Sequence, residues 1–102
     1  MNGMKRTQMV EAADLEILIA SGDLNHGDHG RALNGLREAV DLCRQAGMEG
    51  RATAVLRLME RVIRGDAPRS PEIPRQLGRD GRLERWVDQW LAAAADNAEA
   101  AK

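Results

Sequence analysis

The segment GRATAVLRLMERVIRG, residues 50–65, has the most regular hydrophobic pattern in this chain of 102 residues. Its apolar side chains recur at steps of three and four, which places them on one face of an α-helix. That face comprises Ala52, Val55, Leu56, Met59, Val62 and Ile63. Arg61 and Arg64 fall in the last turn, where cations complement the helix dipole, and Gly65 suits the left-handed position after the end. The segment therefore predicts an amphipathic helix over about residues 50–64.

The preceding segment, residues 29–46, predicts a second helix with Asp28 as its N-cap residue. Its expected inner face is apolar and comprises Ala32, Leu33, Leu36, Ala39, Val40, Cys43 and Ala46. Because only Gly47–Gly50 links these two helices, we expect them to be antiparallel neighbours.

A first helix is predicted over about residues 8–21, followed by a turn-rich loop over 21–30. The helix carries one apolar stripe, formed by Val10, Ala13, Ile17, Ala20 and Leu24. Leu15, Leu18 and Ile19 lie outside that stripe. A helix that is apolar on two sides is either covered on both sides by the core or pairs with another chain, such as a second copy in a homo-oligomer.

Prolines 68, 71 and 74 exclude a regular helix over residues 66–79 and favour an extended linker that packs little. A fourth helix is predicted from Asp80, as N-cap, to about Ala95. Its apolar stripe comprises Leu83, Trp86, Val87, Trp90, Leu91 and Ala94. Residues 96–102 have nothing to bury, and we expect them to fray.

The sequence thus predicts an all-α protein of about four helices in a single domain. A compact three-helix core spans residues 1–65, a Pro-rich linker spans 66–79, and a C-terminal amphipathic helix spans 80–102. The core must be largely aliphatic, because the chain has two Trp but no Tyr or Phe. Cys43 is the only cysteine, so no internal disulfide forms. Without a signal-peptide core or a long apolar stretch, we expect a cytoplasmic protein with no membrane partner.

Residues that could carry chemistry are few. His26 and His29, with Asp23 and Asp28 nearby, could ligate a metal, but they sit in a Gly-rich loop with no further ligand cluster. No serine or cysteine has a credible base, and no glycine-rich phosphate loop follows a strand. We therefore expect no metal, no cofactor and no enzymatic activity.

The second predicted helix resembles the tetratricopeptide repeat. The segment GDHGRAL, residues 27–33, leads into Ala32, Leu36 and Ala39, which match the small–large–small signature of that repeat. The resemblance covers about twenty residues and implies a helical hairpin that offers a groove to a partner helix or peptide. Small chaperones of the type III secretion apparatus are similar in size and in this helix–loop–helix pattern.

A competing resemblance is to the helix-turn-helix of DNA-binding regulators. Residues 42–48 resemble the end of its first helix and the turn, which makes residues 51–64 the recognition helix. Arg51, Arg57, Arg61 and Arg64 would then reach phosphates or guanines. Gly50 makes the turn one residue too long, however, and the net charge of −1 is unlike that of a small DNA-binding domain.

Trp86 and Trp90, one helical turn apart, are either core residues or anchors for a partner. We expect Trp86 to lie in the core and Trp90, nearer the free end, to be the interface residue. The sequence favours a non-enzymatic protein–protein interaction module, acting as an adaptor, a chaperone, or a regulator or inhibitor of the phage-encoded kind. A helix-turn-helix regulator is the alternative, and nucleic acid is the less favoured partner. The candidate partner-binding residues are Leu83, Trp86, Trp90, Arg57, Arg61 and Arg64.

Overall fold

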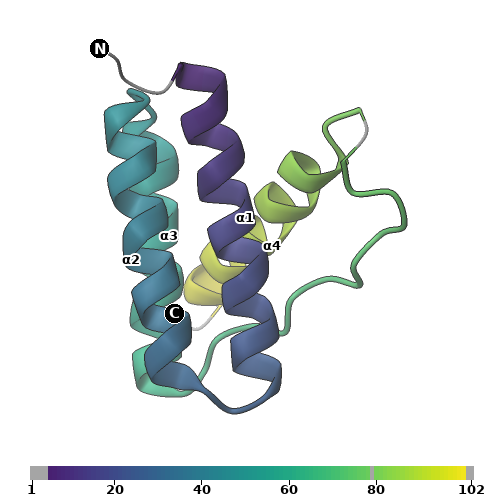
Figure 1. Cartoon of the computed structure of the whole chain (residues 1–102). Coiled ribbons are helices and arrows are strands. Elements are labelled where there is room, and N and C mark those ends of the chain that lie inside the picture. The colour runs from purple at the N-terminus through teal and green to yellow at the C-terminus, as the bar shows by residue number, and fades with distance from the viewer. Residues whose placement is uncertain (1–4, 79, 101–102) are drawn as a thin grey trace.

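The computed structural model describes residues 5–78 and 80–100, which form four α-helices and no strand. The helices are α1 (Arg6–Asn25), α2 (His29–Gln45), α3 (Glu49–Arg64) and α4 (Arg82–Ala100). As Figure 1 shows, α1, α2 and α3 run alongside one another, whereas α4 lies obliquely to them after a longer linker. The predicted all-α fold is confirmed.

The first helix is longer than the sequence suggests. It continues through Gly22 and Asp23 to Asn25, so the connection to α2 is three residues long and the predicted loop over 21–30 is wrong. The helix ends where Gly27 takes a left-handed φ of 78° and the Asp28 amide donates to the Asp23 carbonyl at 2.8 Å. Packing keeps the turn-forming residues helical, because Ser21 is only 1% exposed.

The other helix ends test individual capping predictions. Asp28 caps α2 as expected, since its Oδ1 accepts a hydrogen bond from the Arg31 amide at 3.1 Å. Gly47 and Gly65 both adopt the left-handed conformation after their helices. Asp80 is not the N-cap of α4: it has a φ of 55°, and the helix begins at Arg82, after Gly81. We expected residues 96–102 to fray. The backbone is helical through Ala100, and residues 101–102 lie outside the described part.

One hydrophobic cluster joins all four helices. α2 packs against α1 and α3, and α4 packs against the same two helices. The cluster contains Ala13, Ile17, Ala20, Ala32, Leu36, Ala39, Val40, Cys43, Ala52, Val55, Leu58, Val62, Trp86, Val87, Trp90, Leu91 and Ala94. The fourth helix is therefore part of the main core and not a separate appendage.

The buried face of α3 is rotated relative to the predicted stripe. Leu58 is fully buried, whereas Ile63 is 69% exposed. Arg51 and Arg61 are buried as well. The rotation follows from α4, because it covers a second side of α3 that periodicity alone assigns to solvent.

The linker packs more closely than its prolines suggest. The indole Nε1 of Trp90 donates to the Pro68 carbonyl at 3.0 Å, and that of Trp86 donates to the Pro71 carbonyl at 2.9 Å. The Ser70 hydroxyl lies 2.6 Å from that of Ser21 on α1. The expectation of a spacer that packs little is therefore wrong, because the extended backbone presents carbonyls that the two indoles need.

Candidate partner-binding groove

The six predicted partner-binding residues do not share one surface. Trp86 and Trp90 are 3% and 1% exposed, so Trp90 lies in the core and not at the interface we predicted for it. Arg61 is buried and held by hydrogen bonds within the chain, whereas Arg57 and Arg64 are exposed on α3. Leu83 lines the hollow on the surface between α1 and α4.

This hollow, here called the α1–α4 groove, has a volume of about 340 Å³. Its sides come from the first half of α1, from Leu77, Gly78 and Gly81, and from the first turn of α4. Its apolar lining residues are Val10, Leu15, Leu77 and Leu83. Its ionisable lining residues are Glu11, Asp14 and Glu84. Thr7, Gly78 and Gly81 complete the lining.

Asp14 is the buried carboxylate of the groove. It is 3% exposed, and its Oδ1 lies 2.6 Å from Nη2 of Arg51 on α3. The same Nη2 lies 3.4 Å from Oδ1 of Asp88, an exposed residue of α4. Within the described residues, Nε and Nη1 of Arg51 have no hydrogen-bond partner, and the short contact between Arg51 and Asp14 lacks hydrogen-bond geometry. The pair links α1, α3 and α4, but its hydrogen bonding is incomplete.

Burial raises the pKa of Asp14 to about 6, although the Arg51 charge opposes this rise. Glu84 and Asp88 raise this pKa further by repulsion. Burial also raises the pKa of Asp88, again against the effect of Arg51. Asp14 and Asp88 therefore share the Arg51 guanidinium, and Glu84 is close enough to repel both carboxylates.

Exposed apolar side chains continue from the groove along α1. Leu15, which lines the groove, is 49% exposed, and Ile19, one helical turn further on, is 56% exposed. Both lie outside the predicted core stripe, so the second apolar side of this helix is present, and none of the residues that the structure describes covers it. A contiguous apolar patch on a protein surface often marks a site of contact with another protein.

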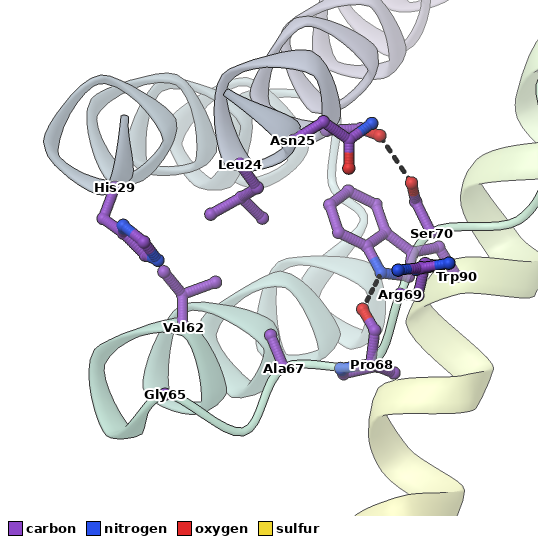
Figure 2. Close-up of a pocket in the computed structure, with 11 residues that line it drawn as sticks. Leu24, Asn25, His29, Val62, Gly65, Ala67, Pro68, Arg69, Ser70 and Trp90 are labelled. Atoms are coloured by element: carbon purple, nitrogen blue, oxygen red, sulfur yellow. Dashed lines mark hydrogen bonds between the residues drawn. The ribbon is translucent and has the colours of Figure 1, made fainter. Parts of the chain in front are cut away.

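A second hollow, of about 250 Å³, lies where the linker crosses the ends of α1 and α3 (Figure 2). Several of its polar groups are paired within the chain: the Ser21 and Ser70 hydroxyls face each other, and Trp90 donates to the Pro68 carbonyl. His29 lies across the hollow from Trp90 (Figure 2), and its Nδ1 is 3.1 Å from the Gly27 carbonyl. These contacts hold the linker against α1 and α4.

The histidines that suggested a metal site face the backbone. Nδ1 of His26 lies 2.8 Å from the Gly22 carbonyl. Across residues 5–78 and 80–95, no three His, Cys, Asp or Glu side chains converge as metal ligands would.

The charged pair of the groove was not predicted from the sequence, although the sequence carries a signal for it. Asp14 lies four residues after Val10 and three before Ile17, so it falls within the apolar stripe of α1. Arg51 lies four residues before Val55 on the buried side of α3. An acid and a base inside the apolar stripes of two helices indicate a buried ion pair between them.

Comparison with protein-family models, with curated proteins and with solved structures finds no match to this chain. In the part of the chain that the structure describes, no helix is long and apolar enough to cross a membrane.

Proposed function

We propose that this chain is a non-enzymatic protein-interaction module that binds a partner protein in the α1–α4 groove. The observation that carries the proposal is the apolar lining of the groove next to the exposed Leu15 and Ile19. A partner helix that places its apolar side chains one turn apart would cover this surface. An adaptor, a chaperone, or a regulator or inhibitor of a larger protein would all use such a surface.

The two tryptophans have a different part in this proposal from the one the sequence suggested. Their rings lie 5.8 Å apart and fill the chain's own core, so they do not anchor the partner. They hold α4 and the linker in place, and this fixes one side of the groove through Leu83 and Leu77.

DNA binding is the second candidate, because Arg57 and Arg64 are exposed on α3. Three observations rank it lower. Arg51 and Arg61, the other two candidate base-reading residues, are buried. The helices α2 and α3 lie alongside each other (Figure 1), whereas the two helices of a helix-turn-helix cross at a steep angle. The net charge is −1.

A capture experiment from native cytoplasm, with and without nuclease, tests the proposal. Leu15→Glu places a charge on the apolar side of the groove and should abolish capture of the partner. Ile63→Glu is the matched control, because Ile63 is also an exposed apolar residue but lies on α3. Capture should survive both Ile63→Glu and nuclease. Nuclease-sensitive capture that is unaffected by Leu15→Glu would instead support the DNA-binding alternative.

A further inference from the structure

The charge of the α1–α4 groove narrows the chemistry of its occupant. In the part of the chain that the structure describes, the three ionisable side chains that line it are all carboxylates. Among the residues that the structure describes, the buried Arg51 guanidinium contacts Asp14 and Asp88, and the Arg85 guanidinium lies near Gly81. Arg85 lies close to Gly81, at the edge of the groove. Its Nη1 is 3.6 Å from the position that the Cβ of a larger residue at 81 would occupy. The lining thus attracts a cation and repels an anion.

Asp14 is a second, independent observation that points to a ligand. Its side chain is only 4% exposed, it lines the groove, and its Oδ1 contacts Arg51 Nη2 at 2.6 Å without hydrogen-bond geometry. A buried carboxylate without its full set of hydrogen bonds is costly, because desolvation is only partly compensated. Arg51 cannot compensate fully, since it also faces Asp88. A second cation that enters from the groove would supply what Asp14 lacks.

The apolar residues of the groove favour a basic side chain over a metal ion as the bound cation. A divalent metal prefers several converging oxygen ligands, and no such cluster occurs among the residues whose side chains are described. Val10, Leu15 and Leu83 instead suit an aliphatic chain that ends in a charged group. Lysine and arginine combine these two properties, because their stems pack on apolar surface while the charged end seeks a carboxylate.

We propose that the groove binds a basic side chain, lysine or arginine, on an amphipathic helix of a partner protein. The aliphatic stem lies between Val10 and Leu83, and the charged end lies at Asp14 and Glu84. The helix extends along α1, where its apolar residues cover Leu15 and Ile19. This inference rests on the proposed function and adds the chemistry of the partner.

Two capped helical peptides and the isotopically labelled full chain provide the test, with binding followed by NMR titration. Each peptide carries two leucines one turn apart and one central residue, which is lysine in the first peptide and norleucine in the second. Norleucine keeps the aliphatic stem and removes the charge. At pH 7.5 the lysine peptide should bind about tenfold more tightly, which corresponds to about 1.4 kcal/mol. The shifted amide signals should be those of residues 7–19, 77–78 and 81–84.

Variants assign the preference to the groove carboxylates. Asp14→Asn and Glu84→Gln should each reduce the preference for lysine, whereas Glu60→Gln, on the exposed side of α3, should preserve it. If Asp14→Asn fails to fold, Glu84→Gln alone still tests the assignment. At pH 5 the wild-type preference should fall, because Asp14 becomes protonated. The charged groups that act on Asp14 are Arg51 on α3 and Glu84 and Asp88 on α4, while Glu11 on α1 lines the same groove and the Cys43 thiol on α2 is itself influenced by Asp14.

The outcomes separate this inference from the proposed function. Equal affinity for the two peptides, or no shift at the groove signals, would overturn the basic-side-chain proposal. The proposed function would survive either result if Leu15→Glu still abolished partner capture. A dimer in sedimentation, with groove signals that shift with protein concentration in the absence of peptide, would instead assign the groove to a second copy of the chain. That result would overturn both the proposal of a partner protein and the proposal of its basic side chain.

Discussion

The two ends of α3 each bury an arginine, and the two arginines differ in how they are held. Arg61 is 7% exposed and Arg51 is 9% exposed. Arg61 donates to Asp66 Oδ1 at 2.9 Å, to the Asp66 carbonyl at 2.6 Å and to the Ala94 carbonyl at 2.8 Å. Arg51 contacts two carboxylates, but its Nε and Nη1 have no hydrogen-bond partner within the described residues.

The difference separates a structural site from a candidate functional one. Arg61 ties the start of the linker and the α4 backbone to α3, and every one of its nitrogens has an acceptor. A buried charge that is fully hydrogen-bonded rigidifies the fold. Arg51 and Asp14 lie beside an open groove with incomplete hydrogen bonding. A ligand in the groove, as proposed above, would supply the hydrogen bonds that this pair lacks.

The largest expected effect is at the Arg61 end, where Trp90 fastens the linker. Trp90→Ala should lower the free energy of unfolding by about 3–5 kcal/mol, because it leaves a cavity in the core. Thermal and urea unfolding measure the change. Ile63→Ala, which shortens an exposed side chain, should change stability by less than about 0.5 kcal/mol. An unchanged melting transition in Trp90→Ala would show that α4 is not part of the core.

The two arginines should respond differently to the same substitution. Arg61→Met should lower the free energy of unfolding by roughly 2–3 kcal/mol, since three charge-assisted hydrogen bonds are lost. Arg51→Met should cost less than half as much at pH 5, because protonated Asp14 no longer needs a cation. Urea unfolding of both variants at pH 5 and pH 7.5 gives the comparison. Equal losses at pH 5 would mean that Arg51 is as structural as Arg61.

The smallest effect is a pH dependence that arises at the Arg51 end. The pKa of Asp14 rises from 3.8 to about 6 on folding, so the folded chain binds the extra proton between these values. The free energy of unfolding should therefore fall as the pH rises from about 4 to 6, by roughly 2 kcal/mol relative to Asp14→Asn. Urea unfolding of the two proteins across this range measures the difference. A wild-type chain that instead gains stability relative to Asp14→Asn as the pH rises would show that Arg51 outweighs burial.

The candidate site was predicted less well than the fold, for reasons visible at particular residues. Leu83 and the exposed Leu15 and Ile19 follow from counting apolar residues along helices. Asp14 and Arg51 carry a signal in their stripes, but an isolated helix gives no means to pair them, since they are distant in sequence. The roles of Arg61 and Trp90 depend on carbonyls of Ala94 and Pro68, and backbone carbonyls leave no mark in the sequence.

The sequence by itself determined the four helices, the antiparallel pairing of α2 and α3, and the glycine stops at Gly47 and Gly65. These features depend on local spacing and on backbone conformation, which neighbouring residues control. Only the tertiary structure decided which side of α3 is buried, that Trp90 belongs to the core, and that the groove lies beside Asp14. Each of these depends on where α4 packs, and the extended linker allows many positions for that helix. Side-chain packing and hydrogen bonds between residues far apart in the chain select one of these positions of α4, and local sequence patterns do not encode such contacts.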